Sequence, residues 1–178
     1  MIKKLIIIFS AVVFVLFIAL VIGAWHLGAF AKVTVTQTER PALYYICRAE
    51  RVPYAQIPAQ LEELRALLPA GAYHYKESGA LIYSDPAATP LNEIESQAVI
   101  LSADSLSLPA PLLVGKLPAG AVLSASIHAN PAIAVFKIYP ALADWLAKNR
   151  PGMRLHYPLL EIYDPPLFTV RIPLQENR

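Results

Sequence analysis

The chain opens with an unbroken apolar run. From Leu5 to Ala31 there is no Asp, Glu, Lys or Arg, and most residues are Ile, Val, Leu, Phe or Ala. About 20 apolar residues in a helix cross a hydrocarbon core of about 30 Å, so this run predicts one membrane span. A buried core helix is the alternative, but soluble helices of this length usually carry a polar face. We therefore expect a transmembrane anchor over residues 1–31, in contact with the lipid bilayer through residues 5–31.

A cleaved signal peptide is a second interpretation of the same run. Lys3 and Lys4 supply a positive N-terminal region, and Ala29-Phe30-Ala31 has the small-x-small pattern of a cleavage site. The run is about twice as long as the apolar region of a signal peptide, which favours an uncleaved single-pass anchor. The two lysines also place the N-terminus in the cytoplasm by the positive-inside rule. The domain is then expected on the periplasmic or extracytoplasmic side.

Beyond the anchor, the pattern changes to short alternating runs and two amphipathic stretches. A strand is predicted where apolar and polar residues alternate, or where β-branched and aromatic residues gather. A helix is predicted where apolar residues recur at three- and four-residue spacing. The predicted strands cover residues 32–38, 42–47, 79–84, 93–101, 120–128, 159–163 and 167–173, and the predicted helices cover 53–68 and 133–149.

The order strand, helix, strand, strand occurs twice along this part of the chain. The two halves also share a sequence motif, at Leu81–Pro86 and Glu161–Pro165. In each copy, a strand ends with an aromatic residue, an acidic residue and a proline. This predicts an α+β fold over residues 32–178, a duplicated βαββ unit whose antiparallel sheet carries two helices on one face. A groove between the helices is a place for a ligand. Pro140 is expected to kink or restart the second helix.

Charge excludes one class of function. Two of the 15 Lys and Arg residues, Lys3 and Lys4, belong to the anchor, which leaves 13 basic and 13 acidic residues in the domain. A nucleic-acid ligand requires many contacts that neutralise phosphates. Because the domain is formally neutral and has no basic stripe, we expect no nucleic-acid partner.

Motifs for cofactors, metals and covalent catalysis are missing from the sequence. Cys47 is the only cysteine and has no histidine near it in the chain, so we expect a buried, inert thiol. The four histidines lack the spacing of a zinc site. The glycine patterns of nucleophile elbows, P-loops and dinucleotide folds are absent as well. We therefore predict no catalytic residue, no cofactor and no metal.

Three sequence segments of the domain resemble a known family. They are Leu81–Pro86, Tyr139–Leu146 and Tyr157–Tyr163, and they are similar to GyrI-like small-molecule-binding domains, which also serve as effector-binding domains of bacterial transcription regulators. The resemblance covers Val33 to Leu174. The order of anchor and domain is similar to that of the membrane-anchored ER-phagy receptors of animals. The sequence has neither a long tail with an autophagy-binding motif nor a helix-turn-helix, so we expect neither an autophagy nor a transcription-factor role.

Glu161 is the residue that carries the functional hypothesis. It stands in a predicted strand among apolar neighbours, and Leu159, Glu161 and Tyr163 share one face by alternation. A carboxylate on a covered face is desolvated and requires a partner. The resemblance implies that Glu161 recognises positive charge inside an aromatic pocket for lipophilic cations, where rings add cation–π attraction. The candidate pocket residues are Trp145, Tyr83, Tyr139 and Tyr163. Alternatively, Glu161 pairs with an internal arginine or a tyrosine hydroxyl, or faces solvent.

These observations support three hypotheses. The first is a membrane-anchored domain that binds a small apolar or cationic molecule. The second is a membrane-tethered adaptor that binds a protein partner and keeps only a vestigial pocket. The third is a small-molecule hydrolase in which burial raises the pKa of Glu161 so that it acts as a general base.

Overall fold

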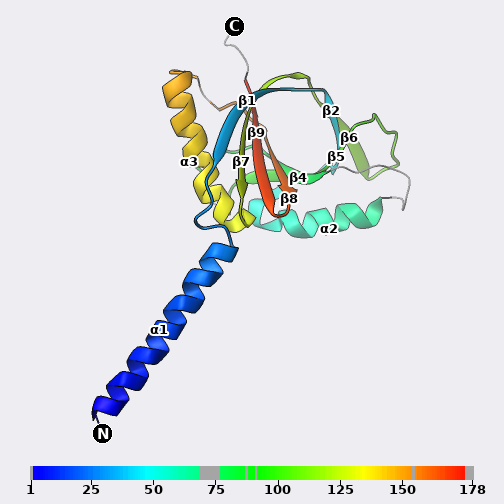
Figure 1. Ribbon diagram of the computed structural model, residues 1–178. Coiled ribbons are helices and arrows are strands. Elements are labelled where there is room, and N and C mark those ends of the chain that lie inside the picture. Colours follow the sequence, from blue (N-terminus) through cyan, green and yellow to red (C-terminus); the bar gives the residue numbers. More distant parts are fainter. Residues whose placement is uncertain (1, 69–76, 87, 91, 154, 175–178) are drawn as a thin grey trace.

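A long helix projects from an α+β domain in the computed structural model, which describes residues 2–68, 77–86, 88–90, 92–153 and 155–174 (Figure 1). The projecting helix is α1 (Ile2–His26), and the domain carries helices α2 (Ile57–Leu67) and α3 (Pro131–Asn149) and the 3₁₀ turn η1 (Tyr54–Gln56). The strands are β1 (Thr34–Arg40), β2 (Leu43–Arg48), β3 (Val52–Pro53), β4 (Glu77–Ile82), β5 (Glu95–Ser102), β6 (Leu112–Leu117), β7 (Gly120–His128), β8 (Leu159–Asp164) and β9 (Leu167–Pro173).

The strands form one antiparallel sheet with an internal symmetry. Its order is β1-β7-β9-β8-β4-β5-β2-β6, with β3 paired to β5. The unit β2-α2-β4-β5 and the unit β7-α3-β8-β9 meet where β4 pairs with β8. The strand that precedes each unit pairs with the other unit, β1 with β7 and β6 with β2. The predicted α+β fold with a duplicated βαββ unit and an antiparallel sheet is confirmed.

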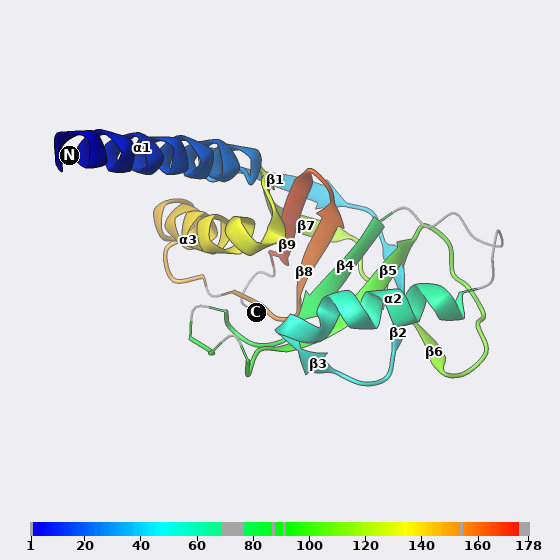
Figure 2. The same ribbon diagram turned by 90° about the horizontal axis from the view of Figure 1, so that it is seen from below.

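Both domain helices pack on the same face of the sheet. Figure 2 shows α2 lying across β4 and β5 while α3 lies beside β7 and β9. One core cluster joins the buried face of α2 and of α3 to one side of the strands. The opposite side of the sheet buries a smaller cluster, made of Cys47, Leu81, Val99, Leu101, Leu160 and Ile162. The prediction of two helices on one face is therefore confirmed, and the sheet buries apolar residues on both faces.

Two local features differ from the prediction. Strand β6 lies between the predicted strands at 93–101 and 120–128, where the sequence pattern predicted no element, and it pairs with β2 at the edge of the sheet. Helix α3 does not restart at Pro140 but continues to Asn149. Proline removes the backbone hydrogen bond to the residue four positions earlier, here Phe136. Since Phe136 and Pro140 both lie on the exposed side of α3, the carbonyl freed by that loss can be solvated.

Helix α1 has the length and composition of a membrane span, and its end is fixed to the domain. The stretch Ile6–His26 has 21 residues and buries none of them in the protein. Gly28 ends the helix with φ +80°, and Ala29 N donates to Ala24 O at 2.9 Å, as in a Schellman motif. The Asn130 backbone N–H donates to Leu27 O at 3.0 Å. The segment that follows α1 therefore belongs to the packed structure of the domain.

Candidate functional site

Glu161 lies in the middle of β8, at the centre of the sheet. It pairs with Ala80 of β4 on one side and with Val170 of β9 on the other. Its neighbours two positions away, Leu159 and Tyr163, point to the helix-covered face with it, as strand alternation predicts. The side chain is only 1% exposed. An acidic group therefore sits inside the layer between the sheet and the helices.

Three tyrosine hydroxyls hold the Glu161 carboxylate. Tyr54 from η1 and Tyr163 from β8 both donate to Oε2 at 2.8 Å, and Tyr139 from α3 donates to Oε1 at 2.5 Å. Within the described residues, no Lys, Arg or His forms an ion pair with Glu161. The carboxylate is thus satisfied by hydroxyl groups, as one of the sequence alternatives proposed, while its charge is left without a counter-ion from those residues.

Burial and hydrogen bonding act on Glu161 in opposite directions. Burial raises the pKa of the carboxyl above its ordinary value, and the hydroxyls of Tyr139, Tyr54 and Tyr163 partly offset this because they stabilise the ionised form. The pKa of Tyr139 and that of Tyr163 are in turn raised, first by burial and then by the nearby carboxylate. The tyrosines therefore keep their protons and remain donors.

A cavity of about 340 Å³ lies beside this carboxylate. It is bounded by η1, α3, the end of β4 and the segment that leads into β5. Most of its surface is apolar, and the polar groups that reach it are few. A volume of this size is in the range of small-molecule sites. Its lining residues are Tyr54, Ile82, Pro86, Thr89, Ile94, Val135, Phe136, Tyr139, Pro140, Ala143 and Glu161.

A second, larger hollow of about 810 Å³ adjoins the cavity, and we call it the α2–α3 groove. It lies between α2 and the first turns of α3. Tyr54, Val135 and Phe136 line both hollows, so these three side chains stand between the groove and the cavity. The larger hollow lies where the duplicated unit predicts a groove between the helices.

The structure brings together only part of the predicted pocket. Tyr139 and Tyr163 meet Glu161 as expected. Trp145 packs half-buried against the core and is not among the residues that line either hollow, because six residues along a helix turn it away from Tyr139. Tyr83 follows Ile82, which lines the cavity, so alternation turns Tyr83 to the opposite face of the sheet. There its ring lies 3.8 Å from the Arg51 guanidinium.

Two site residues were missed by the sequence analysis. Tyr54 falls within the first predicted helix, at 53–68, and no spacing rule shows that its hydroxyl meets a carboxylate 107 residues later. Phe136 falls within the second predicted helix, at 133–149, and is 77% exposed, because Ala134, Ile138 and Leu142 form the buried face of that helix.

Cys47 takes no part in the site. It lies buried on the opposite face of the sheet, and burial raises the pKa of its thiol to about 11. A thiol that stays protonated is a poor nucleophile, which agrees with the inert role expected from the sequence.

Comparisons with known proteins identify solved structures that share this fold. Neither protein-family models nor curated protein sequences give a match. The C-terminal domain of EcmrR is similar in structure, with a TM-score of 0.61 at 15% identity over 82% of this chain and 99% of that domain. In an EcmrR–DNA complex, the similarity spans 58% of the EcmrR chain, with a TM-score of 0.59 and 15% identity over 82% of this chain.

Two further solved structures share the fold. An integron cassette protein from the mobile metagenome of Vibrio cholerae has a TM-score of 0.55 at 12% identity, over 82% of this chain and 99% of that protein. A hydrolase from Listeria innocua has a TM-score of 0.58 at 8% identity, over 81% and 93% of the two chains. These neighbours show that the domain shares its fold with the C-terminal domain of EcmrR, and the similarity to ER-phagy receptors finds no support among them.

Proposed function

We propose that this protein is a membrane-anchored, GyrI-like domain that binds a small apolar molecule, and that a positively charged group of this molecule meets Glu161. The observation that carries the proposal is a fully buried carboxylate that borders an apolar cavity and has only tyrosine hydroxyls as partners among the described residues.

The electrostatics of the site favour a cationic ligand. Three hydroxyl donors stabilise the ionised carboxylate, but they do not neutralise its charge. Inside a protein, the attraction between opposite charges is much stronger than in water because the local dielectric constant is low. Tyr54, Tyr139 and Phe136 line the cavity and offer aromatic surface on which cations bind favourably.

The fold and the open cavity support small-molecule binding over an adaptor role with a vestigial pocket. A GyrI-like effector-binding fold fits small-molecule binding. An adaptor with a vestigial pocket would be expected to fill the space beside Glu161 with side chains, whereas a cavity of about 340 Å³ is present. Helix α1 supplies the anchor in this proposal, and Lys3 and Lys4 keep the domain on the extracytoplasmic side.

Thermal unfolding of the full chain in lipid nanodiscs tests the proposal. The probes are decyltrimethylammonium and its neutral isostere, in which carbon replaces nitrogen. A cation present at 100 times its Kd stabilises the folded state by about 2.7 kcal/mol. We expect stabilisation by the cation, weaker stabilisation by the isostere, and loss of this difference in Glu161→Gln.

The control is Glu93→Gln, which removes the same charge from an exposed position. It should retain the preference for the cation. If neither probe raises the unfolding temperature of the unsubstituted protein, or if Glu161→Gln prefers the cation as strongly as before, the proposal fails.

A further inference from the structure

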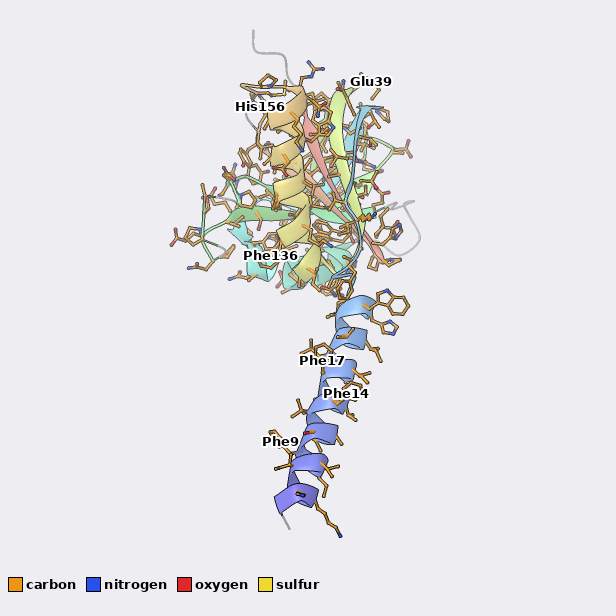
Figure 3. The ribbon with its side chains drawn as sticks, turned by 60° about the vertical axis from the view of Figure 1, so that its left-hand side comes forward. Phe9, Phe14, Phe17, Glu39, Phe136 and His156 are labelled. Atoms are coloured by element: carbon orange, nitrogen blue, oxygen red, sulfur yellow. The ribbon has the colours of Figure 1, made fainter. Side chains whose placement is uncertain are left out.

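The α2–α3 groove opens at the end of the domain from which α1 departs. Its lining includes Asn130, Pro131 and Ala132 at the start of α3. Asn130 is also the residue whose backbone N–H donates to Leu27 O, directly after α1. Figure 1 shows α2 along this same end of the domain, and Figure 3 shows Phe136 close to it. The groove and the exit of the apolar helix therefore share one surface.

Other contacts hold this surface in place next to α1. The Lys137 ammonium group donates to Ala29 O at 2.8 Å and also to Ala31 O. A Cβ at Gly28 would lie 2.5 Å from His128 O and 2.6 Å from Ala129 Cα, so the backbones are in close contact there. The residues between the apolar helix and the groove are therefore held by direct contacts with the domain.

The length of α1 sets the depth of the groove relative to a bilayer. The span Ile6–His26 has 21 residues, and at about 1.5 Å per residue this matches a hydrocarbon core of about 30 Å. His26 then lies where the hydrocarbon ends. Since Leu27 already contacts Asn130, the first residues of the groove lie within the headgroup layer.

The side chains at this end suit such a position. Phe136 lines both hollows and is 77% exposed, the most exposed large apolar side chain of the described domain. Trp25 and Phe30, just before the domain, are 68% and 65% exposed. Exposed aromatic residues gathered at one end of a protein are typical of the membrane interface, and an exposed apolar patch marks a contact surface.

We propose that the Glu161 cavity is loaded from the bilayer, and that its ligand is a membrane-dissolved amphiphile with a cationic group. The amphiphile enters the α2–α3 groove from the headgroup layer, passes Phe136 and places its charge at Glu161, without crossing bulk water. This inference rests on the proposed function and adds the source and the chemical class of the ligand.

Exchange kinetics distinguish a ligand that enters from the membrane and one that enters from water. The full chain in nanodiscs is mixed with alkyltrimethylammonium cations of six, eight or ten carbons, labelled with ¹³C at the N-methyl groups. Exchange NMR gives the rate of loading at one fixed mole fraction of probe in the lipid. Each added methylene lowers the aqueous concentration about fourfold at that mole fraction, so four methylenes lower it about 200-fold.

Entry from the bilayer predicts loading rates that agree within about twofold across the series. A rate that falls about 200-fold from six to ten carbons shows entry from water and overturns the inference, while the proposed function stands. If no member of the series binds, both fail. We also expect Phe136→Asp to slow loading at least fivefold, whereas Leu113→Asp, at an exposed apolar residue of β6, should not. Equal rates in the two variants would contradict a path past Phe136.

Discussion

At the scale of single residues, the protonation of Glu161 links stability and binding to pH. Because burial raises its pKa in the folded protein, the folded state holds a proton that the unfolded chain releases at lower pH. The free energy of unfolding should therefore fall as pH rises from the unfolded pKa to the folded one. A cationic ligand binds best to the ionised acid, so its affinity should rise across the folded pKa.

The tyrosine hydroxyls influence the pH at which Glu161 ionises in the folded protein. We expect Tyr139→Phe, which removes one donor to Glu161, to move the midpoint of cation binding to higher pH by about one unit. This shift corresponds to the roughly 1.5 kcal/mol of a hydrogen bond to a charged group. Titration of Kd against pH measures it. The control is Tyr83→Phe, whose hydroxyl bonds to Gln97 instead. An unchanged midpoint in Tyr139→Phe would show that this hydroxyl does not hold the ionised form.

At the scale of elements, the pairing of β4 with β8 positions the acid. Gly79 lies opposite Ile162, and a Cβ there would lie 1.9 Å from the backbone oxygen of Glu161. We expect Gly79→Ala to separate the two strands and to lower the free energy of unfolding by about 2 kcal/mol or more. Denaturant unfolding in nanodiscs measures the loss. Gly23→Ala has open space around it and should leave the domain's stability unchanged. Equal stability of the two variants would mean that the strands adjust at no cost.

Elements and faces could be predicted from local patterns, whereas the partners of Glu161 could not. Alternation and helical spacing are properties of neighbouring residues, so they predicted the duplicated unit and the inward direction of Glu161. The meeting of Tyr54 with Glu161 depends on how α2 and its 3₁₀ turn sit on the other half of the sheet. Tyr83 was predicted to line the pocket because of the resemblance. Since Ile82 points to the cavity, alternation along β4 directs Tyr83 to the opposite face of the sheet.

At the scale of the whole molecule, the proposed anchoring makes the junction between α1 and the domain the part that sets which surface faces the bilayer. The Schellman end of α1, the backbone contact of Gly28 and the two carbonyls held by Lys137 act together on residues 27–31. The same residues include the small-x-small phrase of the signal-peptide interpretation. Cleavage after Ala31 would remove these contacts from the start of α3.

A single substitution should release this arrangement. Gly28→Ala places a Cβ against His128 O and Ala129 at a residue with φ +80°, where side chains are strained. We expect the angle between α1 and the domain to vary, so that the distance distribution between spin labels at Val15→Cys and Glu93→Cys broadens in nanodiscs. Lys137→Met, which loses only the side-chain bonds, should broaden it less. A distribution as narrow as that of the parent in both variants would mean that the bilayer, rather than the junction, orients the groove.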